Sequence, residues 1–308
     1  MSNADAALIL AHPFVLALVG LIAIWRPWRE DPKALAPWAL PLVLAFAYPL
    51  GRHAISSLPS FPPPVADEWL VFAAVAVGGW GIVEARFPTM PAAGKRTARL
   101  IFVAAVFWLM VIDHISIINY AFLVIGVATL IAAIDGAART ESTSFTLWTF
   151  AIVASASTPI LLFGASFRLA LLAATLGAVA AAGALVSTVF RAGDKIFVSP
   201  VVMPFCLLLA GLYVSGVRFA MAPFWSAIII AVALLLPLSL CKRRNTAKEG
   251  RWKVYAICLA LVATIAGSAV AYAYYETQVE KPPAIEVDGE RDGGAGEGES
   301  DYDNPYTW

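Results

Sequence analysis

The chain has 308 residues, of which 60% are hydrophobic and only 14% are charged, and its mean hydropathy is +0.78. Soluble domains carry about 25% charged residues, so this composition excludes a soluble globular protein and predicts an all-α, multi-pass membrane protein. The 21 basic and 21 acidic residues balance, but about half of the acids lie in residues 276–308. The chain therefore divides into a membrane domain, residues 1–275, and an acidic tail, residues 276–308.

Apolar segments long enough to cross a bilayer recur throughout residues 1–275. A membrane helix needs about 20 mostly apolar residues, and this length predicts ten spans, at residues 5–25, 37–56, 68–84, 98–114, 118–135, 144–165, 169–190, 196–216, 219–240 and 253–275. The fourth and fifth spans form one stretch, interrupted only around Asp113, His114 and Asn119, which suits either a tight hairpin or one long helix. No basic residue precedes the first span, so we expect it to remain as a membrane helix rather than act as a signal peptide.

The distribution of basic residues favours the hairpin and orients the chain. With ten spans, most of the 21 basic residues fall in loops on one side, at positions 26, 29, 33, 86, 95, 96, 99, 139, 191, 195, 242, 243, 244, 248, 251 and 253. The loops on the opposite side contain only Arg52, Arg168 and Arg218. Cytoplasmic loops are enriched in Lys and Arg, so we expect an inner (plasma) membrane protein with both termini exoplasmic.

Few ionisable residues interrupt the predicted spans. Arg52, Glu84, Asp113, Asp135 and Arg168 all map to span ends, where we expect contact with lipid head groups. Small residues at four-residue spacing predict helix-packing faces in the seventh span, at Ala173, Gly177 and Ala181, and in the tenth, at Ala263, Gly267 and Ala271.

All three histidines map to the exoplasmic half of this topology. His12 lies in the first span, His53 ends the second, and His114 ends the fourth beside Asp113. Imidazoles from separate helices with an adjacent carboxylate suit a transition metal or haem site, whereas isolated interfacial histidines need no ligand. The cysteines have no C-x-x-C spacing that would indicate zinc. A metal or haem is therefore an alternative and not the favoured interpretation.

A proline interrupts the sixth span near its middle, in the segment Ser155, Ala156, Ser157, Thr158, Pro159. Proline leaves the carbonyl four residues earlier without its helical donor, so hydroxyls and a bare carbonyl gather at mid-depth. Transporters bind substrates and ions at such breaks, but Ser and Thr also bond back to their own helix. This segment predicts a substrate or ion site at Ser155, Ser157, Thr158 and Pro159 in a permease for a neutral solute or a lipid.

The tail combines acidic and glycine-rich sequence with aromatic residues at its end. Its composition does not favour independent folding, so we expect a disordered or extended segment. Asp301, Tyr302, Asp303, Tyr306 and Trp308 form an acidic and aromatic cluster suited to docking on a basic exoplasmic partner. A solvated tail without a function is the alternative.

These features predict a membrane protein without an enzymatic signature. No phosphate-binding loop, nucleophile elbow or H-E-x-x-H motif is present in the sequence. We expect a non-catalytic subunit or scaffold of a larger inner-membrane assembly, with the tail docking a protein partner. A permease and a metal or haem protein are the alternatives; membrane lipids are expected partners, and nucleic acid is not.

Overall fold

A computed structural model describes residues 3–25, 36–55, 58–111, 115–190, 199–244 and 251–279. These residues form ten α-helices and one short 3-10 turn, and the all-α prediction is confirmed. The elements are α1 (Asn3–Trp25), α2 (Ala39–Ile55), η2 (Ala66–Glu68), α3 (Trp69–Arg86), α4 (Ala92–Val111), α5 (Ile117–Ala138), α6 (Thr143–Phe163), α7 (Phe167–Val189), α8 (Ser199–Phe219), α9 (Phe224–Arg244) and α10 (Arg251–Val279).

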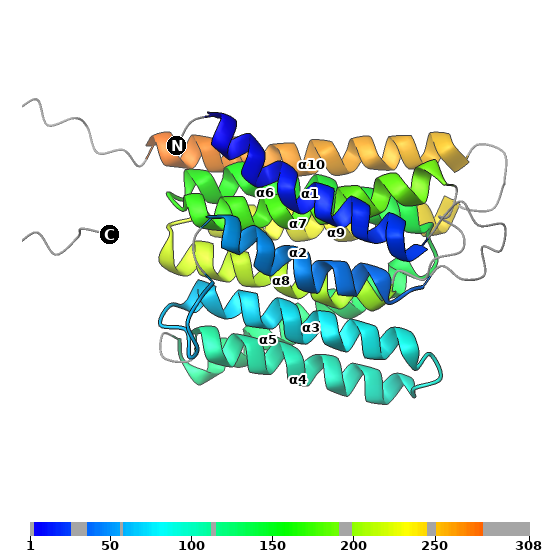
Figure 1. Cartoon of the computed structure of the whole chain (residues 1–308). Helices are drawn as coiled ribbons and strands as arrows, with labels where there is room; N and C mark the ends of the chain where they lie inside the picture. The colour runs from blue at the N-terminus through cyan, green and yellow to red at the C-terminus, as the bar shows by residue number, and fades with distance from the viewer. Residues whose placement is uncertain are drawn as a thin grey trace, which may run out of the picture.

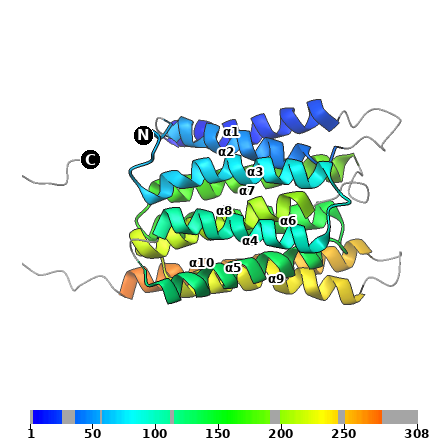
Figure 2. The same cartoon turned by 90° about the horizontal axis from the view of Figure 1, so that it is seen from below.

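The helices lie side by side and alternate in direction (Figures 1 and 2). The start of α1 and the end of α10 lie at the same end of the bundle, which we call the termini end. At the opposite end α1, α3, α5, α7 and α9 finish; we call it the basic-loop end. Six described helices are long and apolar enough to cross a membrane: α3, α5, α6, α7, α8 and α10. This finding supports a multi-pass membrane protein.

The fourth and fifth predicted spans are separate helices, α4 and α5, so the hairpin is confirmed and the single long helix is wrong. The Ser116 side chain caps α5 by accepting a hydrogen bond from the Asn119 backbone at 3.3 Å. The Tyr120 hydroxyl then donates to the Ala104 carbonyl of α4 at 2.6 Å and fastens the two helices together.

The core is centred on α7 and α8, whereas α5 and α10 are the least buried of the long apolar helices. Phe150 of α6 stacks on Phe205 of α8 with ring centroids 4.2 Å apart. Helix α3 approaches α8 so closely that a Cβ on Gly81 would lie 2.6 Å from the Pro200 carbonyl oxygen. Only glycine fits this crossing without a shift of the backbone.

The predicted small-residue faces of α7 and α10 differ in the structure: the first is packed against another helix and the second is exposed. In α7, a Cβ on Gly177 would lie 3.1 Å from the Ser155 Oγ of α6, so this face packs within the chain as predicted. In α10, Ala263, Gly267 and Ala271 are exposed, and no atom lies within 4 Å of a Cβ placed on Gly267. Within the described part of the chain α10 is buried on its other side, with Val262, Ala266 and Ala269, so the predicted packing face of α10 stays a prediction.

Candidate functional site

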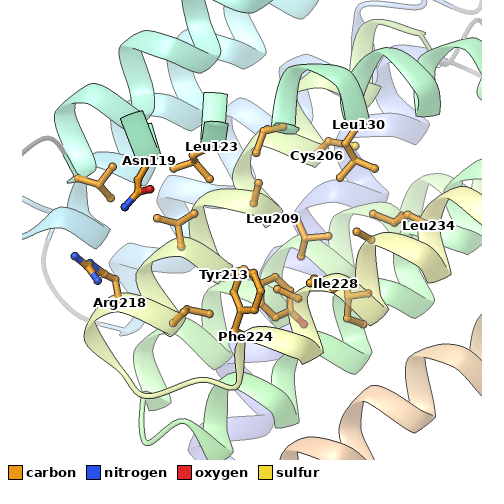
Figure 3. A pocket seen from close by; sticks show the side chains of 18 of the residues that line it. Asn119, Leu123, Leu130, Cys206, Leu209, Tyr213, Arg218, Phe224, Ile228 and Leu234 are labelled. Atoms are coloured by element: carbon orange, nitrogen blue, oxygen red, sulfur yellow. The ribbon is translucent and has the colours of Figure 1, made fainter. Parts of the chain in front are cut away.

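A pocket of about 400 Å³ lies between α5, α8 and α9 (Figure 3). Its lining is almost entirely apolar. Helix α5 contributes Leu123, Val127 and Leu130, spaced so that they share one helix face. Helices α8 and α9 close the other sides, with small residues at Ala210, Ala227 and Ala231. These short side chains leave the space between the three helices unfilled.

The pocket extends along the helices for roughly the depth of one lipid leaflet. From Asn119 to Leu130 the lining spans eleven residue steps of α5, about 16 Å at a rise of 1.5 Å per residue. The hydrocarbon core of a bilayer is about 30 Å thick, so the length of the pocket is about half of that thickness. Phe224 and Ile228 line the pocket and are themselves exposed, so the pocket reaches the outer surface of the bundle.

The polar groups of the pocket are concentrated at one end. Asn119 and Arg218 lie at the end of the pocket nearer the termini end of the bundle, and Leu130, Cys206 and Leu234 lie at its opposite end (Figure 3). Asn119 and Arg218 are both exposed. The site is thus amphipathic along its length, with hydrogen-bond donors at the surface and hydrocarbon behind them.

Tyr213 links this pocket to the predicted proline-interrupted site of α6. Its ring lines the pocket, and its hydroxyl donates to Ser157 Oγ at 3.0 Å. Ser157 is fully buried and donates to its own helix at the Val153 carbonyl, at 2.8 Å. Tyr213 therefore separates Ser157 from the pocket.

The other residues of that predicted site also stand outside the pocket. The Thr158 hydroxyl donates to the Ala154 carbonyl at 3.4 Å, and Pro159 is half-buried within α6. The Ser155 hydroxyl lies against Gly177 of α7. A substrate or ion site at these four residues stays a prediction, and their hydroxyls bond mainly within α6.

The structure does not bring the described histidines into a metal centre. His12 on α1 and His53 on α2 are both exposed. Among the described residues, no three His, Cys, Asp or Glu side chains are grouped to hold a metal ion. His114 and Asp113 lie outside the described residues, so the predicted haem or metal site is not assembled from the part that can be seen.

A buried ionic cluster, which we call the Arg99 cluster, connects four helices at the basic-loop end. Arg99 of α4 binds Glu84 of α3 through two bonds, from Nη2 at 2.6 Å and from Nε at 3.2 Å, and donates to Asp135 of α5 at 2.8 Å. Asp135 also accepts hydrogen bonds from Arg139 and from Ser199 at the start of α8. Glu84, Arg99 and Asp135 are only 2%, 8% and 5% exposed.

This cluster corrects the interpretation of Glu84 and Asp135 as isolated residues in contact with head groups. A carboxylate removed from water requires an opposite charge and donors, and Arg99 supplies both from within α4. The sequence signal was the presence of opposite charges near ends of consecutive helices that meet at one side of the bundle. The sequence does not show that α3, α4, α5 and α8 are neighbours there.

A second ionic cluster lies at the termini end. Arg52 of α2 pairs with Glu68 at 3.1 Å, and Arg168 of α7 pairs with Asp67 at 3.2 Å. Arg52 is only 2% exposed, so it too is held by protein carboxylates rather than by head groups alone. The turn η2 thereby connects α2 to α7.

The tail residues Asp301, Tyr302, Asp303, Tyr306 and Trp308 lie outside the described residues, as does the rest of residues 280–308. Comparisons of the chain with protein-family models, with curated proteins and with solved structures find no match.

Proposed function

We propose that the chain is an inner-membrane protein whose ten helices all cross the bilayer, and that it binds a lipid in the pocket between α5, α8 and α9. One observation carries the proposal: an apolar pocket of about 400 Å³ has its polar residues, Asn119 and Arg218, at a single end. A lipid has the same polarity along its length. Its chain would fill the apolar part, and acceptor oxygens of its head group would meet the two donors.

The loop charges support a specific leaflet. The loops and helix ends at the basic-loop end contain most of the Lys and Arg residues, which favours a cytoplasmic location for that end. The termini end is then exoplasmic, and the polar end of the pocket lies at the exoplasmic head groups. Trp225, next to Phe224 at the start of α9, is exposed at this level, as is typical of interfacial tryptophans.

Lateral entry from the bilayer fits the position of the pocket. Helix α5 is the least buried of the long apolar helices, and the pocket reaches the surface beside Ile228. A lipid would exchange directly with the surrounding leaflet without crossing water. This supports a lipid-binding or lipid-transporting protein over a permease for a water-soluble solute.

Filling the pocket tests the proposal. We expect Ala227→Phe and Ala231→Phe to reduce the lipid that remains bound after purification in mild detergent, measured by native mass spectrometry. Ala105→Phe is the matched control, because Ala105 is exposed on α4 and does not line the pocket. Folding is checked by the thermal unfolding of each variant. Equal lipid retention by folded pocket variants and the control would overturn the proposal.

A second candidate function is a subunit of a larger membrane assembly. The observation that favours it is the outward face of α10, where Ala263, Gly267 and Ala271 allow close approach of another helix. The acidic tail follows α10 directly, so one segment would contact a partner within the membrane and another outside it. Gly267→Leu should then shorten the list of proteins that co-purify, and deletion of residues 280–308 should remove an exoplasmic partner. Unchanged co-purification in both variants would contradict this role.

A further inference from the structure

A second groove, of about 430 Å³, lies between α4 and α5. Leu100 and Val103 of α4 form one wall, and Ile125, Ala128 and Ala132 of α5 form the other. Arg96 and Arg99 lie at its basic-loop end. The groove occupies the opposite half of the bundle from the polar end of the first pocket, and it involves neither α8 nor α9.

Of the two arginines that line the groove, only Arg99 is paired with carboxylates of described residues. Arg99 is neutralised by Glu84 and Asp135. Arg96 is exposed and forms no ion pair with a described residue. The groove thus presents a net positive charge at the head-group level and an apolar trough beneath it. Basic grooves between membrane helices are suited to anionic lipid head groups.

We infer that the α4–α5 groove is a binding site for an anionic phospholipid of the leaflet at the basic-loop end. The phosphate lies at Arg96, and one acyl chain lies between Leu100 and Val103 on one side and Ala128 and Ala132 on the other. Arg96 to Val103 covers about 10 Å of helix at 1.5 Å per residue. The groove therefore holds the head-group region and the first part of the chain.

The α4–α5 groove and the lipid pocket are separate sites. The two sites use different faces of α5: Leu123, Val127 and Leu130 face the pocket, whereas Ile125, Ala128 and Ala132 face the groove. Their polar ends point to opposite leaflets. Either site can be filled by a side chain without occupying the other.

The test compares two arginines at the same end of the bundle. Arg86 and Arg96 are both exposed, and neither pairs with a described residue, but only Arg96 lines the groove. Purified full-length protein is titrated with phosphatidylglycerol and with phosphatidylcholine and followed by native mass spectrometry. We expect wild type to prefer phosphatidylglycerol, Arg96→Gln to weaken its binding about fivefold, and Arg86→Gln to leave it unchanged.

Two further variants separate this site from the first pocket. Ala128→Phe should abolish the phosphatidylglycerol preference by filling the groove, and Ala231→Phe, in the pocket, should leave that preference intact. Equal weakening by Arg96→Gln and Arg86→Gln would overturn the inference, because it would indicate diffuse surface charge. Equal affinity of wild type for the two lipids would also overturn it. Loss of lipid in Ala231→Phe alone would support the pocket and contradict the groove.

Discussion

Asp135→Asn should strongly destabilise the protein, because it removes one carboxylate of the buried Arg99 cluster. Asp135 is 5% exposed and accepts hydrogen bonds from Arg99, Arg139 and Ser199. The asparagine amide has nearly the same shape as the Asp135 carboxylate but no negative charge. Its N–H group would face groups that are themselves donors, in Arg99, Arg139 and Ser199. Removing one partner of a buried ion pair costs about 3–5 kcal/mol, because Arg99 keeps its pair with Glu84 but its Nη1 loses the carboxylate of Asp135 as acceptor.

Arg139→Gln is a matched control within the same cluster. The Arg139 side chain is 43% exposed and pairs with Asp135 at i,i+4 spacing. Such a pair contributes only about 0.3–0.5 kcal/mol. At about 2 °C per kcal/mol for a chain of this size, we expect Asp135→Asn to lower the melting temperature by about 6–10 °C and Arg139→Gln by about 1 °C.

The assay is thermal unfolding of the purified variants in one detergent, with a third variant that removes the whole buried network. Glu84→Gln, Arg99→Met and Asp135→Asn together leave no uncompensated buried charge, so this triple variant should be more stable than Asp135→Asn alone. Two results would refute the reasoning. One is equal destabilisation by Asp135→Asn and Arg139→Gln, and the other is a triple variant less stable than Asp135→Asn.

Three other substitutions or analyses follow from the contacts of the helices. Gly81→Ala should destabilise the protein, because the new Cβ would lie 2.6 Å from the Pro200 carbonyl oxygen. A Cβ on Gly79 meets no atom within 4 Å, so Gly79→Ala should stabilise α3 by up to about 1 kcal/mol. Equal melting temperatures of the two variants would contradict this difference. Tyr213→Phe should cost about 1 kcal/mol in unfolding free energy through loss of its hydrogen bond to Ser157, and a gain in stability would show that the bond is unimportant. Elemental analysis and absorbance of pure protein test the predicted histidine site directly, and a metal or haem signal that disappears in His12→Ala would confirm that site.

The helices were predictable from sequence because each depends on its own segment. Apolar length identified the ten helices, and loop charge separated α4 from α5. Boundaries were less accurate where polar residues continue a helix: α10 extends to Val279, four residues beyond its predicted end, because Glu276 and Thr277 are compatible with helix outside the apolar segment.

The pocket and the ionic clusters were not predictable because they depend on which helices are neighbours. Val127, Tyr213 and Ala231 are ordinary apolar or aromatic positions in three separate segments, and nothing in their spacing shows that they face one another. Arg99 was assigned to a basic loop by its charge alone, whereas it lies within α4 and meets two carboxylates from other helices. Pairing across helices is a property of the packed bundle, and a single sequence contains no direct record of it.

The orientation of the bundle decides which leaflet each proposed lipid site serves, and two exposed loop residues can establish it. Ser60 precedes η2 at the termini end, and Thr89 lies between α3 and α4 at the basic-loop end; both are exposed. Each is replaced by cysteine in a chain whose three native cysteines are removed, and intact cells are treated with a membrane-impermeant maleimide. Because the loop charges favour a cytoplasmic basic-loop end, Ser60→Cys should be labelled in intact cells and Thr89→Cys only after permeabilisation. The reverse labelling pattern would overturn the exoplasmic assignment of the termini. The polar end of the pocket between α5, α8 and α9 would then lie in the cytoplasmic leaflet, and the chemistry of the ligand that fits the pocket would be unchanged.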